Sequence, residues 1–168
     1  MKKSILVIEG SDDLRTGLVI LLRLVGYDAI GESTPSAGLQ RLLERDFDLV
    51  ITDWMIGRLT AESMLVQADT AGALEGVGVL IHTGWPYIDR PASLARAVIV
   101  TKSPRSEILM ETIARMLPGT LHPEFARRLF TASSAPEPTR NLPERQAEQD
   151  RPAVWSSVGV RNRIQAAK

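Results

Sequence analysis

Four short and continuous apolar runs constrain the fold of this chain more than any other feature of its sequence. They cover residues 5–8, 49–51, 77–81 and 97–100. Apolar and polar residues do not alternate within them, which is typical of strands that are covered on both faces. The segment between the first two runs has helical periodicity instead, with leucines at 14, 18, 21 and 22 followed by Val25. Strands that alternate with helices at this spacing predict βαβ units and therefore a parallel sheet.

A fifth strand and five helices complete the predicted α/β domain. Residues 27–32 form a short edge strand, and the third and fourth helices, at about 61–70 and 89–95, have the weakest periodicity. Five strands with helices on both faces form a doubly wound parallel sheet, for which a flavodoxin-like strand order of 2-1-3-4-5 is favoured. The order does not follow from the apolar pattern itself.

The composition changes after residue 117, so we expect the folded domain to cover residues 1–117. Residues 118–152 read as a proline-rich linker, because the stretch 131–152 holds four prolines and almost no large apolar side chain. Residues 153–168 form a short C-terminal segment in which apolar side chains return, among them Trp155. This segment is either a docking peptide or a part of the chain that packs back on the domain.

The net charge and the absence of cysteine limit the kinds of binding partner and the cellular compartment that we expect. Twenty basic side chains balance twenty acidic ones, so no global field attracts nucleic acid or an anionic membrane, and we expect neither as a partner. Residues 1–117 carry 12 Lys and Arg against 15 Asp and Glu. The remaining residues therefore carry 8 against 5, a spread-out excess that is typical of a solvated segment. The chain has no cysteine, and its N-terminal apolar run is too short for a signal peptide, so we expect a cytoplasmic protein.

Polar side chains follow four of the predicted strands, at the point where each strand ends. They are Glu9, Asp53, Thr83 and Lys102. In a doubly wound sheet, ligands bind in the crevice outside the carboxyl ends of the strands. A carboxylate can attack phosphorus, carboxylate oxygens can hold a divalent ion, and an ammonium and a hydroxyl can stabilise transferred oxygens. These residue types predict a site for phosphoryl transfer.

The same residues lie in segments that resemble the receiver domains of bacterial two-component signalling. The segments ILVIEGSDDLR, FDLVITDWMI, VLIHTG and VIVTKSP occur in the order of that family, over nearly all of residues 4–117. The resemblance implies that a histidine kinase phosphorylates Asp53. It implies that Thr83 bonds a phosphoryl oxygen, that Lys102 pairs with the phosphoryl group, and that the backbone carbonyl of Met55 binds Mg²⁺.

One departure from the family pattern affects the metal. Receivers usually end the first strand with two acidic residues, the second of which binds the metal directly, whereas this chain has Glu9 followed by Gly10. Metal ligands would then be Glu9, Asp53 and the Met55 carbonyl. Asp12 is a further candidate, although at the start of a helix it would more often serve as a cap. The sequence therefore predicts a degenerate receiver with weak Mg²⁺ binding.

Two functions follow, and each site residue also has a purely structural interpretation. In the structural interpretation, Asp53 is a turn residue, Lys102 is a loop side chain with a solvated end, and Thr83 is an ordinary strand residue. The first function is a stand-alone response regulator that takes a phosphoryl group from a histidine kinase or a phosphotransfer protein. It is not an enzyme with a separate substrate, and it signals to a downstream protein target by contact. The alternative is a pseudo-receiver, a binding module that works without phosphorylation. A dinucleotide-binding enzyme is disfavoured, because EGSDD is not a glycine-rich phosphate loop.

Overall fold

Five parallel strands form the centre of the computed structural model, which describes residues 2–85, 88 and 92–119. The strands are β1 (Ser4–Ile8), β2 (Asp28–Glu32), β3 (Leu49–Thr52), β6 (Gly78–Thr83) and β7 (Val98–Thr101). They pair in the order β2-β1-β3-β6-β7, and every pair is parallel. The predicted five-stranded parallel sheet and its flavodoxin-like order are therefore confirmed.

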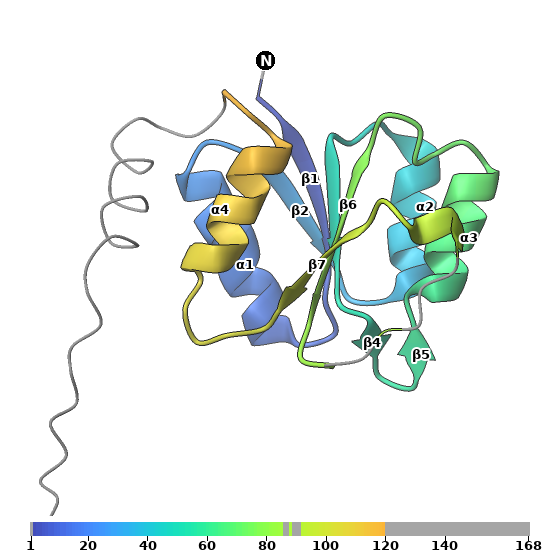
Figure 1. The fold of residues 1–168 in the computed structure, drawn as a ribbon, viewed down its shortest axis with the longest axis horizontal. Helices are drawn as coiled ribbons and strands as arrows, with labels where there is room; N and C mark the ends of the chain where they lie inside the picture. The colour runs from blue at the N-terminus through green and yellow to red at the C-terminus, as the bar shows by residue number, and fades with distance from the viewer. Residues whose placement is uncertain (1, 86–87, 89–91, 120–168) are drawn as a thin grey trace, which may run out of the picture. The chain divides into compact units, whose positions relative to one another are not determined.

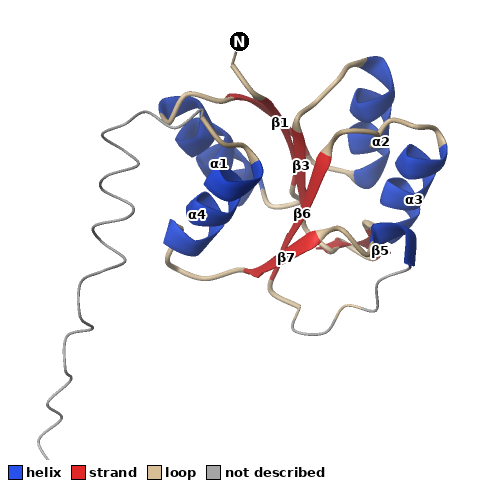
Figure 2. Ribbon diagram, turned by 45° about the horizontal axis from the view of Figure 1, so that its top comes forward, coloured by secondary structure: helices blue, strands red, loops and turns tan. Residues whose placement is uncertain are grey.

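Helices cover both faces of this sheet. Figures 1 and 2 show α1 (Asp12–Leu24) and α4 (Glu107–Met116) on one face, and α2 (Pro35–Glu44) and α3 (Glu62–Thr70) on the other. Two of the helices begin with a side-chain cap. In α1, Ser11 Oγ accepts from Leu14 N, and in α2, Thr34 Oγ1 accepts from Ala37 N. None of the helices in the described part of the chain is long and apolar enough to cross a membrane.

Burial on both sides explains the continuous apolar runs. In β1, Ile5 and Val7 pack in the cluster beneath α1 and α4, whereas Leu6 and Ile8 pack in the cluster beneath α2 and α3. All four are at most 1% exposed. The side chains of such a strand point alternately into two apolar layers. Every position therefore needs an apolar side chain, which gives a run without polar interruptions.

Two parts of the fold differ from the prediction. The predicted helix over residues 89–95 is wrong for its described part, which contains only a 3-10 helix, η1 (Ala92–Leu94). This segment has one large apolar side chain, Leu94, and so lacks the apolar stripe that a longer helix would bury. The chain also forms a small antiparallel hairpin that was not predicted, β4 (Met55–Ile56) with β5 (Leu59–Thr60).

The predicted division of the remaining chain lies almost wholly outside the described residues. Of the linker at 118–152, only residues 118 and 119 are described, and none of the C-terminal segment 153–168 is described. Both stay predictions. The predicted end of the folded domain at residue 117 falls next to the end of α4, at Met116.

Candidate phosphoacceptor site

Three of the predicted site residues occupy equivalent positions in the sheet. Glu9, Asp53 and Lys102 each come directly after a strand, and the backbone N–H of each donates to the neighbouring strand. Glu9 N donates to Glu32 O at 3.0 Å, Asp53 N to Ile8 O at 3.0 Å, and Lys102 N to Thr83 O at 2.8 Å. Because the strands are parallel, their carboxyl ends meet at one edge of the sheet, and these hydrogen bonds fix the three backbones there.

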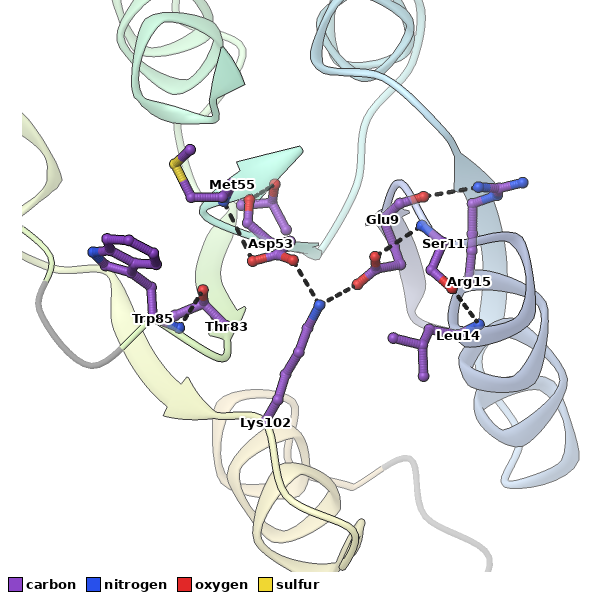
Figure 3. A network of polar contacts seen from close by, with 10 residues as sticks. Glu9, Ser11, Leu14, Arg15, Asp53, Met55, Thr83, Trp85 and Lys102 are labelled. Atoms are coloured by element: carbon purple, nitrogen blue, oxygen red, sulfur yellow. Dashed lines mark hydrogen bonds and ion pairs between the residues drawn. The ribbon is translucent and has the colours of Figure 1, made fainter. Parts of the chain in front are cut away.

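Lys102 joins the two carboxylates. Its Nζ lies 2.6 Å from Glu9 Oε2 and 2.6 Å from Asp53 Oδ2, as Figure 3 shows. The side chains are largely buried, with exposed fractions of 23% for Lys102, 11% for Glu9 and 13% for Asp53. Burial alone would lower the pKa of Lys102, but its hydrogen bonds to Asp53 and Glu9 outweigh burial and raise that pKa. Lys102 is therefore a fixed positive charge between two negative ones.

The other two carboxylate oxygens accept from backbone N–H groups. Glu9 Oε1 accepts from Ser11 N at 3.0 Å, and Asp53 Oδ1 accepts from Met55 N at 3.3 Å. Figure 3 shows both bonds on either side of the lysine bridge. Each of the four oxygens thus has one hydrogen-bond donor, so both carboxylates are held in orientation by the protein itself.

Thr83 lies at the same edge but outside the lysine bridge. It is the last residue of β6 and is 2% exposed. Its Oγ1 accepts from Trp85 N at 3.1 Å. The indole of Trp85 is 57% exposed and Met55 is 36% exposed, and Figure 3 shows these two residues on the Thr83 side of Asp53. The structure therefore places the predicted hydroxyl at the same edge of the sheet as Asp53, next to the exposed Trp85.

Asp12 pairs with an arginine of its own helix and has no contact with the bridge lysine. Its carboxylate is 84% exposed and forms an ion pair with Arg15, one turn along α1. The Arg15 guanidinium also donates from Nη1 to Glu9 O at 2.8 Å. In this arrangement Asp12 supports the start of α1, and it forms no metal-binding group with Glu9 and Asp53 among the described residues.

A divalent ion finds few ligands in this arrangement. No group of three or more His, Asp or Glu side chains in residues 2–85, 88 and 92–119 is placed to hold a metal. Of the predicted ligands, Glu9 and Asp53 lie together, but Lys102 stands between their facing oxygens and Gly10 adds no carboxylate. Two carboxylates whose facing oxygens are already bound to an ammonium are a poor donor set for a hard divalent ion, which is held by the number and charge of its oxygen ligands.

His82 is a titratable neighbour of the lysine bridge. It is the residue before Thr83 in β6 and is half-buried. Burial and the charge of Lys102 lower the pKa of His82, and together they outweigh the carboxylates of Glu9 and Asp53, which raise it. In the sequence, only the position of His82 directly before Thr83 indicated that the imidazole would lie near the site.

An apolar groove opens beside Glu9 and Lys102. It lies between α1 and the loop that leads from β7 to α4, and its volume is about 450 Å³. Its apolar lining comes mainly from leucines: Leu14, Leu18, Leu21 and Leu109. Leu14 was predicted as part of the buried stripe of α1, but it is 55% exposed because the groove leaves it uncovered.

Comparison with known proteins places this fold in a defined class. No protein-family model matches the sequence, and no curated protein sequence matches it. Among solved structures, the response regulator TrrA from Thermotoga maritima, in complex with Mg²⁺-BeF, is similar with a TM-score of 0.61 and 21% identity, over 68% of this chain and 99% of that chain. The chemotaxis protein CheY4 of Vibrio cholerae is similar with a TM-score of 0.63 and 17% identity, over 70% and 100%.

A third solved structure shows a receiver with its kinase. It is the complex of the histidine kinase ThkA with TrrA, in which the matching chain has a TM-score of 0.58 and 21% identity, over 68% of this chain and 98% of that chain. These similarities identify the fold as that of response-regulator receiver domains of the CheY-like type. The resemblance predicted from the sequence is thereby confirmed at the level of the fold.

Proposed function

We propose that this chain is a receiver that accepts a phosphoryl group on Asp53 from a histidine kinase or a phosphotransfer protein. The observation that carries the proposal is the bridge in which Lys102 Nζ lies 2.6 Å from both Asp53 Oδ2 and Glu9 Oε2 at the carboxyl ends of the strands. Removing a lysine and two carboxylates from water costs free energy that their mutual attraction has to offset, and clusters of this kind gather at functional sites.

The proposed reaction uses groups that are already in position. A carboxylate oxygen of Asp53 attacks the phosphorus of the donor, a new P–O bond forms, and the bond from phosphorus to the donor's nitrogen breaks. The donor nitrogen keeps the bonding electron pair. Each Asp53 oxygen accepts one hydrogen bond, and a carboxylate oxygen has a second lone pair that is free to attack. Lys102 offsets the added negative charge, and the Thr83 hydroxyl is available to a transferred oxygen.

The proposed partners follow from the surroundings of Asp53. One of the similar solved structures is a complex of a response regulator with a histidine kinase, which supports a kinase as the donor. The leucine-lined groove beside Glu9 and Lys102 offers apolar surface next to the acceptor. Phosphorylation adds negative charge at the edge of the sheet, and a downstream protein would read the resulting change of surface by contact.

A pseudo-receiver is the second candidate, and two observations favour it. Gly10 contributes no acidic side chain, and Lys102 closes the space between the remaining carboxylates. In that case the same domain would act as a binding module and Asp53 would never carry a phosphoryl group.

Intact mass spectrometry separates the two functions. The full chain is incubated with a small phosphodonor, in parallel with Mg²⁺ and with a chelator, and compared with Asp53→Asn. Asp46→Asn is the matched control, because Asp46 is exposed and lies seven residues before Asp53 on the same segment. We expect wild type and Asp46→Asn to gain one phosphoryl group and Asp53→Asn to gain none. No gain by wild type in either condition would support the pseudo-receiver.

A further inference from the structure

We infer that Lys102 occupies the place of a divalent cation in this site, so that the protein supplies its own counter-ion to Glu9 and Asp53 and excludes Mg²⁺ from between them. The inference concerns the site on which the proposed function rests, but it does not require Asp53 to be phosphorylated. It therefore stands or fails by metal binding alone.

The position of the Lys102 ammonium between the two carboxylates supports the inference that it replaces a metal ion. Lys102 Nζ contacts the two facing carboxylate oxygens, Glu9 Oε2 and Asp53 Oδ2, at 2.6 Å each, so an ion held between the two carboxylates would meet the ammonium there. The outer oxygens are tied to the backbone N–H groups of Ser11 and Met55. An incoming ion would have to displace the ammonium first, and it would then lie next to a positive charge.

The local charge supports the same conclusion. Glu9 and Asp53 contribute two negative charges and Lys102 one positive charge, so the bridge has a net charge of −1. Hard divalent ions are held mainly by the number and charge of their oxygen ligands. With Gly10 following Glu9, a third carboxylate is missing at the position nearest the bridge.

Gly10 is a residue at which this carboxylate can be added. The backbone of Gly10 is outside the left-handed region, and a Cβ there would lie 3.2 Å from Ile56 Cγ2, a methyl group at the end of a side chain. Ile56 would have to shift by a few tenths of an ångström to make room for the new side chain. Gly10→Asp therefore adds a ligand without changing the lysine, and Gly10→Ala is its control for packing.

The test is a titration of the full chain with Mn²⁺ alone, with no phosphodonor present. Free Mn²⁺ is followed by its electron paramagnetic resonance signal, which is lost as the ion binds. The variants are Gly10→Asp, Gly10→Ala, Lys102→Met and Arg105→Met. The last removes a positive charge from the same groove, but the hydrogen bonds to the facing carboxylate oxygens come from Lys102 and not from this arginine.

We expect wild type, Gly10→Ala and Arg105→Met to show no saturable binding below about 1 mM Mn²⁺, the weak end of protein sites for hard cations. Gly10→Asp should bind at least about tenfold more tightly, the scale on which changes around a metal site act, and Lys102→Met should also bind more tightly than Arg105→Met. Saturable binding by wild type that equals Gly10→Asp would overturn the inference. So would equal binding by Lys102→Met and Arg105→Met. If Lys102→Met does not fold, Lys102→Gln takes its place in the comparison with Arg105→Met, because Gly10→Asp leaves the lysine unchanged and cannot test it.

Discussion

The ammonium of Lys102 lies 2.6 Å from Asp53 Oδ2, although 49 residues separate the two in the sequence. Asp53 follows β3 and Lys102 follows β7, and β6 lies between these strands in the sheet. The contact therefore spans a whole strand and exists only when three parallel strands are in register. A long lysine side chain is the residue type that can reach this far while keeping its stem on apolar surface.

Loss of the bridge should destabilise the fold in a salt-dependent way. Lys102→Met leaves Glu9 and Asp53 as two neighbouring negative charges in a largely buried setting. We expect a loss of about 1–3 kcal/mol in the free energy of unfolding, between the values for exposed and buried pairs. Because added salt screens the repulsion, part of the loss should return at high ionic strength.

Urea denaturation at low and high NaCl measures this effect. Arg105→Met is the control, since it removes a charge nearby without uncovering a carboxylate pair. Equal stability of Lys102→Met and wild type at low salt would show that the bridge contributes nothing to folding.

His82 should make the folded protein less stable at acid pH. Burial and Lys102 lower its pKa below the ordinary value of 6.5, so the unfolded chain binds a proton at a pH where the folded protein does not. The stabilising contribution is therefore complete above the unfolded pKa and is lost as the pH falls through the folded pKa. We expect His82→Gln to lose less thermal stability than wild type between about pH 7.5 and pH 5.5.

The chain has only one other histidine, His122, and His122→Gln serves as the control. It should retain the pH dependence of wild type. A His82→Gln protein whose Tm falls with pH as steeply as that of wild type would contradict the role assigned to His82.

Two helical glycines provide a matched test of packing. A Cβ at Gly38 in α2 would collide with Ile8, whose Cγ1 would be only 2.9 Å away, whereas a Cβ at Gly17 in α1 would meet nothing within 4 Å. Alanine favours a helix over glycine by about 0.5–1 kcal/mol. We expect Gly17→Ala to stabilise the protein by about that amount. Gly38→Ala should destabilise it by about 1–3 kcal/mol, the range for overpacked cores.

The free energies of unfolding of the two variants, measured together, separate helix propensity from close packing of α2 on β1. If both substitutions stabilised the protein, α2 would not pack against Ile8 as closely as described.

Much of the fold and part of the site were predictable because they depend on local patterns. The run at 49–51 has no polar interruption because β3 is buried on both faces, and a strand-end rule was enough to expect Asp53 and Lys102 at one edge. The rule predicts at which edge of the sheet the side chains lie, but it does not predict the distances between them. It could not show that Lys102 reaches both carboxylates, since this depends on the side-chain conformation in the assembled sheet.

Other features lack a sequence signal of sufficient length. The hairpin of β4 and β5 has two residues in each strand, and its turn contains Gly57 with φ of 65°, which is too short for an alternating pattern to stand out. Asp12 was a candidate ligand on proximity in sequence, but the ion pair with Arg15 directs it elsewhere. The prediction of a helix near residues 89–95 was wrong because Leu94 alone cannot form an apolar stripe.

Localisation of the phosphoryl group within the chain shows whether Asp53 is the acceptor. After treatment with a phosphodonor, borohydride reduction converts an aspartyl phosphate into homoserine, which survives digestion. Trypsin is expected to release residues 46–58, a peptide that holds Asp46, Asp48 and Asp53 together. Fragmentation of this peptide by tandem mass spectrometry assigns the modified residue. We predict homoserine at position 53 and unmodified aspartate at 46 and 48. An unmodified Asp53 in a chain that has gained a phosphoryl group, or no gain under any condition, would contradict the account.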